Sequence, residues 1–302
     1  MIDEVSMNLS GYTLQQDRAT YLKTAITTTT STSASPLIMS LGSSDNLGKG
    51  IVEIDEELLW VDSYDRVGNT ASVSPYGRGY LGTTAATHTA DTKVTIAPTF
   101  PRFAVKRAIN DTITAVGSSI FAASTTTITS NAAVAAFRLP TTGTTLNIRN
   151  ILSVAYQSIG ASKEWIPIRT WRFDGNANST AFTSGQTISI YDVVPSGRTI
   201  QIVYSKDPTP FTSNSDVFTT TTGLPESCKD LIILGATYRL LSNLDPARAS
   251  MISPQADETD AKRPYGSSQS ITKQIYALFN QRLTEEIKKQ QDIYPIRIHY
   301  SL

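Results

Sequence analysis

The sequence predicts an α+β protein, with a helical core, a small antiparallel β insert and a larger β-sandwich-like domain. Three observations support this class. Serine and threonine make up about a quarter of the chain while 40% of its residues are hydrophobic, which favours strands over disorder. Short alternating runs broken by Gly, Asn and Pro fill residues 36–98 and 120–223. Runs with helical spacing lie before, between and after these two regions.

Charge and cysteine content exclude several classes of protein. The 302 residues carry 26 Lys and Arg against 26 Asp and Glu, so neither a basic nucleic-acid coat nor an acidic tail is expected. The single cysteine, Cys228, excludes an internal disulfide framework and a multi-thiolate metal site. Residues 1–7 lack the features of a signal peptide, and no run of 18 apolar residues occurs. We therefore expect no signal peptide and no membrane span.

Residues 1–35 are predicted to hold an N-terminal helix and a linker. Between residues 11 and 26, Leu14, Arg18, Tyr21 and Leu22 fall near one face at helical spacing, with Thr13 as N-cap. The Ser- and Thr-rich residues 27–35 disfavour continuation of the helix.

Residues 36–98 are predicted to form the small antiparallel β module. Its apolar runs are short and broken by turn residues. The segment Asp65-Arg66-Val67-Gly68-Asn69 predicts a hairpin turn between the strand that contains Trp60 and the strand at residues 71–74, because Gly and Asn tolerate positive φ.

Residues 99–119 are predicted to contain a helix that begins with Pro101 in its first turn and stops at Gly117. Residues 120–223 then carry the sandwich-like domain. Apolar and polar residues alternate on both sides of the turn at Pro195-Ser196-Gly197, as a sheet with one solvated face requires. The predicted strands of this domain are 133–139, 148–159, 165–173, 187–194 and 199–204.

Residues 224–294 are predicted to be helical and 295–302 to form an arm. A buried stripe is expected in the first helix, and Asp245-Pro246 is typical of the start of a second. In the long helix at 269–294 the apolar residues step by four, so their row drifts around the helix and indicates more than one neighbour. Pro295 ends that helix, and the alternating residues after it predict a terminal strand.

The candidates for chemistry favour structural roles. His88 and His299 are the only histidines, so a Ser-His-Asp relay or a histidine metal site is not expected, and we interpret His88 as a turn-capping side chain. Glycines 77, 79 and 82 lack the Gly-Lys-Ser/Thr of a phosphate loop. The acidic run at 53–57 is compatible with paired carboxylates or a calcium site, but a solvated hairpin turn is favoured. Cys228 is expected to be a passive thiol. We predict no enzyme, no metal and no cofactor.

Two stretches resemble known phage proteins. Arg78-Gly79-Tyr80-Leu81-Gly82-Thr83-Thr84-Ala85-Ala86-Thr87-His88, which follows the strand Glu57-Leu58-Leu59-Trp60-Val61, resembles a β-hairpin module of structural proteins in tailed bacteriophages. Asp91 stands where that module more usually has glycine. Leu224-Pro225 followed by residues 230–241 is similar to a helix of phage head-to-tail adaptor (neck) proteins.

The resemblance implies a virion structural protein, assembled in the host cytoplasm. It implies a homo-oligomeric ring, commonly a dodecamer, that connects the portal protein to other neck or tail proteins around the DNA exit channel. Copy number depends on a subunit rotation that no motif encodes. The alternative is a glycan- or receptor-binding virion protein that uses Trp60, Trp165 and Trp171, although core packing is favoured for these residues. A weaker third class is a carboxylate-dependent hydrolase.

Three groups of residues are predicted to make contacts in the assembly. Arg102, Lys106 and Arg107 are possible channel contacts for weak, non-specific DNA binding, with a solvated helix face as the favoured alternative. Tyr294, Ile296, Ile298 and Tyr300 are expected to dock on the portal or a neighbour, against the alternative that the arm folds back on its own β domain. The oligomer interface is assigned to Leu231, Leu234, Tyr238, Leu241, Ile275, Phe279, Leu283 and Ile287.

Overall fold

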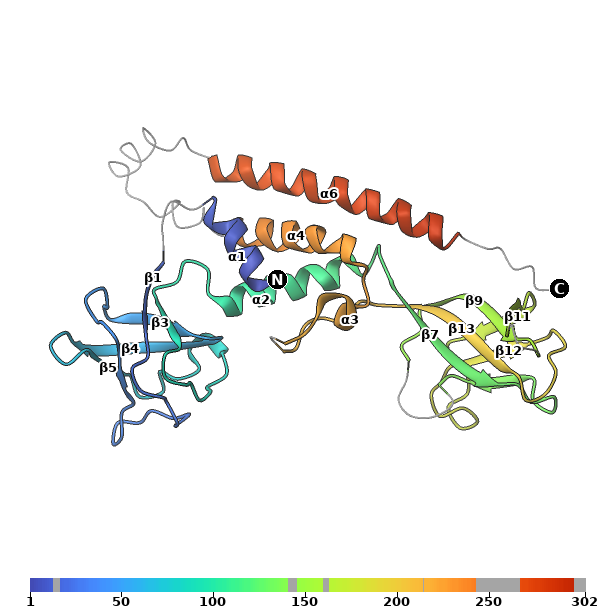
Figure 1. The fold of residues 1–302 in the computed structure, drawn as a ribbon, viewed down its shortest axis with the longest axis horizontal. Coiled ribbons are helices and arrows are strands. Elements are labelled where there is room, and N and C mark those ends of the chain that lie inside the picture. Colours follow the sequence, from blue (N-terminus) through green and yellow to red (C-terminus); the bar gives the residue numbers. More distant parts are fainter. Residues whose placement is uncertain (13–16, 141–145, 160–162, 214, 243–266, 296–302) are drawn as a thin grey trace. The chain divides into compact units, whose positions relative to one another are not determined.

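Helices and antiparallel strands follow each other in blocks along the chain. The computed structural model describes residues 1–12, 17–140, 146–159, 163–213, 215–242 and 267–295 (Figure 1). Within those ranges it has five α-helices and 13 strands, and each strand pairing is antiparallel. The α+β class is therefore confirmed.

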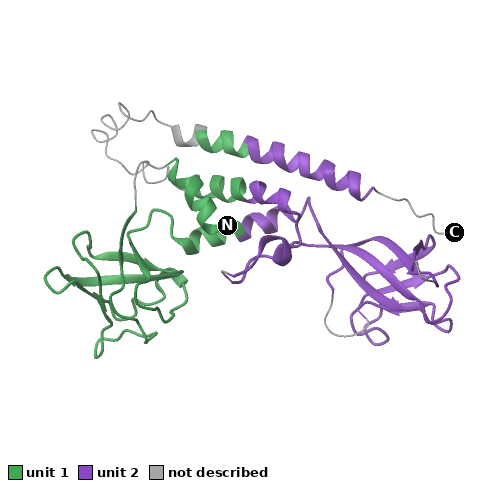
Figure 2. Cartoon of the chain, viewed as in Figure 1, with its two compact units in different colours: residues 1–109, 233–276 green, residues 110–232, 277–302 purple. Residues whose placement is uncertain are grey.

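The chain divides into two units, coloured separately in Figure 2. Unit 1 contains residues 1–109 and 233–276, and unit 2 contains residues 110–232 and 277–302. The dividing points fall inside α2 (Arg102–Val116), α4 (Lys229–Leu241) and α6 (Ser267–Ile293).

Unit 1 holds a six-stranded sheet in the order β1-β6-β3-β4-β5-β2. The β4–β5 pairing confirms the hairpin predicted around residues 65–69, and a second hairpin joins β3 to β4 through Asp55 and Glu56. The strands are β1 (Arg18–Tyr21), β2 (Ile38–Ser40), β3 (Gly50–Ile54), β4 (Glu57–Asp65), β5 (Thr70–Val73) and β6 (Lys93–Ile96).

The helix predicted between residues 11 and 26 is wrong. The N-terminal helix α1 spans Ile2–Ser10, and Arg18–Tyr21 pairs with β6 as strand β1. Leu22, which suggested a helical stripe, is instead buried in the hydrophobic core of the sheet. The β-branched and aromatic residues Thr20 and Tyr21 favour this extended backbone. Thr13 and Leu14 lie outside the described residues.

The two ends of the chain segment that forms the β structure of unit 1 lie together. The core of this structure is one cluster of twelve buried apolar residues that runs from Leu22 to Val94. The ends of the segment meet because the Asp17 carboxylate accepts hydrogen bonds from the backbone N–H and the hydroxyl of Thr99, each at 3.1 Å. We call residues 17–99 the N-terminal β module. The module thus includes a strand that lies before the predicted 36–98 insert.

Unit 2 holds two antiparallel sheets. The four-stranded sheet has the order β10-β9-β13-β7 and the three-stranded sheet the order β11-β12-β8. Strand β7 was not predicted, because its Thr-rich sequence carries few apolar residues. The strands on either side of the turn at 195–197, β12 and β13, belong to different sheets. The strands are β7 (Ala122–Thr129), β8 (Ala136–Arg138), β9 (Asn150–Gln157), β10 (Trp165–Pro167), β11 (Trp171–Asp174), β12 (Thr187–Ile190) and β13 (Thr199–Lys206).

The two sheets of unit 2 share one hydrophobic core. Ile128, Val154 and Ile200 contribute to it from the four-stranded sheet, and Ile188 and Ile190 from the three-stranded sheet. In β13, buried and less buried residues alternate, as a strand with one face on a core requires. We call residues 120–210 the second β domain.

The helices bury apolar side chains, but the predicted arrangement with a helical core is not confirmed. Helix α2 follows Pro101 and is followed by Gly117, as predicted. Buried apolar side chains occur on α1, α2, α4 and α6, among them Leu9, Ile113, Leu231 and Ile275. The short helix α3 spans Phe218–Thr222, and 3-10 turns lie at Tyr80–Gly82 and Glu226–Cys228.

Two predictions fall on residues that the structure does not describe. The helix start at Asp245-Pro246 lies within residues 243–266, and the terminal strand lies within residues 296–302.

Candidate functional site

A buried carboxylate, Glu57, organises the loop that carried the phage-like motif. Its Oε1 accepts hydrogen bonds from Arg78 Nε at 2.6 Å and from the Gly79 backbone N–H at 3.0 Å. Its Oε2 accepts bonds from Arg78 Nη2 at 2.9 Å and from the Ala86 backbone N–H at 3.0 Å. His88 Nε2 lies 2.9 Å from the same oxygen. Five donors from one loop thus converge on one side chain at the start of β4.

His88 links this buried carboxylate to a second one. Its Nδ1 lies 2.8 Å from Asp55 Oδ2, whose side chain is exposed at the β3–β4 turn. With a carboxylate on each ring nitrogen, both nitrogens act as donors only when the imidazole is protonated. We call Asp55, Glu57, Arg78 and His88 the Glu57 cluster.

The pKa values in the cluster follow from these contacts. Burial raises the pKa of Glu57, but the hydrogen bonds from Arg78, His88, Ala86 and Gly79 outweigh it and lower that pKa to about 2. Burial lowers the pKa of His88, whereas the bonds to Glu57 and Asp55 raise it more, so its pKa lies above the ordinary 6.5. Glu57, Arg78 and His88 of the cluster are therefore buried, with the Glu57 carboxylate against the Arg78 and His88 side chains.

Backbone geometry explains the glycines of the motif. Gly79 has φ +61°, and a Cβ there would lie 2.7 Å from the carbonyl oxygen of Thr83. Asp91, which stands where the resembling module has glycine, has φ +64°. Asp is one of the residues that tolerates the left-handed conformation, so the substitution keeps the turn.

The structure settles three predictions about this region. His88 is buried and bonded, which agrees with a structural role, although it joins two carboxylates instead of capping a turn. The glycine loop does bind an anion, but that anion is the chain's own Glu57. The prediction of a solvated acidic turn at 53–57 is wrong for Glu53 and Glu57, which are 4% and 1% exposed.

Glu53 caps a helix. Its carboxylate accepts a hydrogen bond from the backbone N–H of Arg102, the first residue of α2. A carboxylate at this end of a helix also meets the positive end of the helix dipole. Burial nevertheless raises the pKa of Glu53 to about 7, against the lowering effect of the Arg102 bond.

In unit 2, Glu286 of α6 joins the helix to the segment at the start of α4. The Ser227 hydroxyl donates to Glu286 at 2.9 Å, and the Cys228 thiol lies 3.7 Å from the same oxygen. Arg282 bonds Asp230 at 2.7 Å and Glu286 at 3.1 Å. Burial and then the Glu286 charge raise the pKa of Cys228 to about 12, so this thiol is passive, as predicted.

The three tryptophans lie in three different sheets. Trp60 lies in β4 of unit 1, where its ring is 5.2 Å from that of Tyr80. Trp171 packs against the core of the second β domain, which agrees with core packing. Trp165 lies in the other sheet of that domain and is 40% exposed.

The residues assigned to the oligomer interface differ in exposure. Leu231, Leu241, Ile275 and Phe279 are buried within the subunit at 0–7% exposure. Leu234, Tyr238, Leu283 and Ile287 are half-buried. On α6 the exposed apolar side chains are at other positions, namely Ile271, Tyr276, Leu278 and Ile293.

Of the three candidate DNA contacts, two are engaged by carboxylates of unit 1. Arg102 Nη1 lies 2.5 Å from Asp3 Oδ1, and Lys106 Nζ lies 3.0 Å from Glu56 Oε2. Arg107 is exposed.

Of the residues assigned to docking, the structure describes Tyr294. Its ring lies 5.8 Å from that of Phe121, whose backbone N–H and carbonyl both bond the Gln290 side chain. Ile296, Ile298 and Tyr300 lie outside the described residues.

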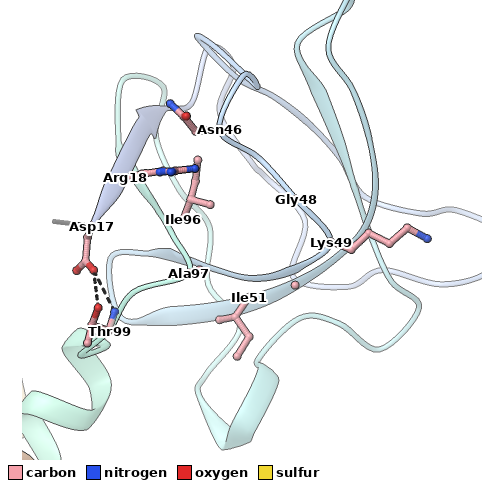
Figure 3. A pocket seen from close by; sticks show the side chains of 10 residues that line it. Asp17, Arg18, Asn46, Gly48, Lys49, Ile51, Ile96, Ala97 and Thr99 are labelled. Atoms are coloured by element: carbon pink, nitrogen blue, oxygen red, sulfur yellow. Dashed lines mark hydrogen bonds between the residues drawn. The ribbon is translucent and has the colours of Figure 1, made fainter. Parts of the chain in front are cut away.

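A cavity of about 480 Å³ lies at the β1 edge of the N-terminal β module (Figure 3). Its titratable lining side chains are Asp17, Arg18 and Lys49. Asp17 bonds Thr99 and so closes the module, while Arg18 lies beside Ile96 and Lys49 points away from them. The carboxylate therefore has a structural role.

Neither a metal-binding group nor a membrane-spanning helix is found where the structure describes the chain. No cluster of three His, Cys, Asp or Glu side chains there is arranged to hold an ion. None of the helices described is long and apolar enough to cross a bilayer.

Comparison with known proteins gives the family. No curated protein matches the chain. The sequence profile of the SU10 adaptor protein family matches residues 80–297, which is more than half of the chain. That range holds most of the phage-like loop and all of the stretch at 224–241. The chain therefore belongs to the SU10 adaptor protein family, a family of phage adaptors, which confirms the suspected resemblance.

Proposed function

We propose that this protein is a ring-forming head-to-tail adaptor that connects the portal of a tailed phage to its tail and surrounds the DNA exit channel. The observation that carries the proposal is the family match over residues 80–297. A virion location and a structural role follow from membership of a phage adaptor family. The ring, the portal contact and the channel are the parts that experiment has to test.

The chemistry of the reactive side chains supports a structural and not an enzymatic role. His88 is held between two carboxylates, and Glu57 is bound by five donors. Cys228 is buried beside a carboxylate that disfavours its thiolate. Each of these groups already has a partner within the fold, so each is used to hold the subunit together.

The ring interface is proposed to involve the half-buried side chains of α4 and α6. Leu234, Tyr238, Leu283 and Ile287 keep part of their apolar surface exposed in the single subunit. Leu231 and Ile275 of the same helices are buried within the subunit. Covering such residues in an oligomer adds hydrophobic stabilisation.

Contact with DNA in the channel is proposed to be weak. Arg107 is the exposed member of the three candidate cations, whereas Arg102 and Lys106 face carboxylates. A chain with zero formal charge gives little long-range attraction to phosphate.

Co-expression with the portal protein of the same phage tests the proposal. We expect the two proteins to co-purify and electron microscopy to show a ring of this chain on the portal, with twelve copies. A chain truncated after Tyr294 tests the arm: weaker portal binding or loss of the ring supports docking by Ile296, Ile298 and Tyr300. Failure of the full chain to bind the portal or form a ring would contradict the proposed function.

A further inference from the structure

The second β domain exposes its large apolar side chains at one end. Within residues 120–210 the structure gives six exposed large hydrophobic side chains, with exposed fractions from 37% to 95%. All six lie in the connections β7–β8, β9–β10 and β12–β13 or at the start of β10. We call them the apolar tip: Val134, Ile159, Trp165, Ile166, Tyr191 and Val193.

The strand registers show that these segments share one end of the domain. In the four-stranded sheet the end of β7 pairs with the start of β13 (Thr129 with Thr199), and the end of β9 pairs with the start of β10 (Gln157 with Trp165). In the other sheet, the end of β12 lies beside the start of β11 (Ile190 with Trp171). The β7–β8 and β12–β13 connections join the two sheets at this same end.

Hydrogen bonds hold these connections together. The Ser130 N–H donates to the Arg198 carbonyl at 2.7 Å, and the Tyr191 N–H donates to the Thr170 carbonyl at 3.0 Å. The Asp192 carboxylate accepts from the backbone N–H groups of Arg169 and Thr170 at 2.7 and 3.2 Å. These hydrogen bonds thus fix the connections that carry the apolar tip.

A cluster of exposed apolar side chains that includes a tryptophan is typical of a protein interaction surface. At the domain's other end, no large apolar side chain among the described residues is exposed. Because the apolar residues are concentrated at one end, they are not the scattered exposed residues of an ordinary surface.

The net charges of the two β structures indicate what the apolar tip binds. Residues 120–210 contain seven Lys and Arg against four Asp and Glu, a formal charge of +3. Residues 17–99 contain six against nine, a formal charge of −3. The formal charge of residues 17–99 stays negative when the buried Glu53, Glu57 and Arg78 are left out. Opposite net charges on these two parts of the chain favour contact between the second β domain of one copy and the N-terminal β module of another.

The β4–β5 hairpin of the N-terminal β module presents a complementary surface. Residues 62–68 are all exposed, and they combine Asp62, Asp65 and Arg66, a formal charge of −1, with Tyr64 and Val67. Asp65 accepts bonds from the N–H groups of Val67 and Gly68, which fixes the turn and leaves Val67 95% exposed.

We propose that the apolar tip of one copy binds the β4–β5 hairpin of the next copy in the ring. This inference rests on the proposed ring. A ring needs a head-to-tail interface made of two different surfaces. Here the β domains that carry these surfaces have opposite net charges, and both surfaces expose apolar side chains. In the proposed contact Val193 and Trp165 meet Val67 and Tyr64, and Lys163 lies near Asp62 of the neighbour.

Cross-linking in the assembled portal complex tests the contact. Val193→Cys and Val67→Cys place thiols at two positions that are each 95% exposed, so neither change should disturb the fold. The native cysteine, Cys228, is buried. With a short bismaleimide we expect the double variant to give a ladder of linked subunits, and each single variant to give none.

An assembly assay provides the second measurement. Val193→Asp should reduce the fraction of subunits in rings at least about tenfold, because it places a charge in an apolar contact. Val67→Lys in the same chain should restore much of this loss. The matched control is Val217→Asp, at a position 60% exposed outside the tip, which should assemble as the unchanged chain does.

The outcomes separate the two proposals. A ring without a ladder, together with normal assembly of Val193→Asp, overturns this contact and leaves the adaptor function standing. Cross-links in the Val193→Cys single variant also overturn it, because the tip would then meet another tip. Failure of the unchanged chain to form a ring with its portal overturns both.

Discussion

At the scale of single residues, the chain uses its chemically active side chains to hold loops in place. Glu57 receives five donors from a loop whose glycines adopt left-handed backbone. Thr83 adds to this arrangement, since its hydroxyl accepts from the Leu58 N–H and donates to the Tyr80 carbonyl. The motif residues thus share one physical task, which is to fold the loop around a buried carboxylate.

We predict that Glu57→Gln destabilises the protein by roughly 3–5 kcal/mol, because it leaves the buried Arg78 without its counter-charge. The measurement is the free energy of unfolding by denaturant, followed by circular dichroism. Glu56→Gln is the matched control one residue away. Glu56 is partly exposed in an ion pair with Lys106, so its loss should change stability by about 1 kcal/mol or less. Equal effects of the two variants would contradict a special role for Glu57.

The titration of His88 gives a second prediction. Because its pKa in the folded protein is raised, His88 stabilises the fold fully below its unfolded pKa near 6.5, and this contribution is lost as the pH rises through the folded value. Titration of the His88 ring protons, followed by proton NMR, should give a midpoint above pH 6.5. Glu57→Gln should lower that midpoint. A midpoint below 6.5 in the unchanged protein would show that burial, and not the carboxylates, dominates.

At the scale of elements, sequence patterns predicted what is local and missed what depends on pairing. The helix that starts after Pro101 and the β4–β5 hairpin are confirmed, since proline and the Asp-to-Asn turn act within a few residues. Strand β1 was mistaken for a helix because its role depends on β6, more than 70 residues later. The Thr-rich β7 was missed because it carries few apolar residues, and its partner β13 lies about 70 residues later.

The candidate site shows the same limit. The sequence singled out Arg78, Gly79 and His88, but the acidic run was interpreted as solvated because nothing local reveals that Glu57 faces those residues. Its register at the start of β4 places it there. The apolar tip was not predicted either, since its residues are apolar in sequence and only the strand registers gather them at one end.

For α4 we predict that burial, and not helical position alone, decides the effect of a charge. Leu231→Asp puts a carboxylate at a position that is 0% exposed and should destabilise the fold by at least about 3 kcal/mol. Leu234→Asp, on the same helix at a half-buried position, should have about half that effect or less. Thermal unfolding of both variants compares them. If Leu234→Asp is the more harmful, the assignment of the buried face of α4 is wrong.

At the scale of the whole molecule, the two units organise different β structures around separate cores. The core of the N-terminal β module lies within one continuous segment of chain, and so does the core of the second β domain. In unit 1, polar contacts join the module to α2, among them Glu53 with Arg102 and Glu56 with Lys106. Polar contacts of this kind contribute less to folding than an apolar core does.

We therefore predict that residues 17–99 fold when expressed alone. All twelve buried apolar residues of the core cluster lie in this fragment, as do all six strands of the sheet. The bonds of Asp17 to Thr99 join its ends, so excision leaves no strand unpaired and separates no part of the core. The fragment also keeps the whole Glu57 cluster, which holds the loop after β5 against the sheet through hydrogen bonds.

Proton NMR of the fragment should show dispersed amide signals, and its thermal unfolding should be a single cooperative transition. A fragment of residues 36–98 is the matched comparison, since it lacks β1 and the Asp17 bond and should unfold at a lower temperature. Collapsed amide signals from the longer fragment would mean that the module depends on the helices, and the boundary at Asp17 and Thr99 would then be wrong.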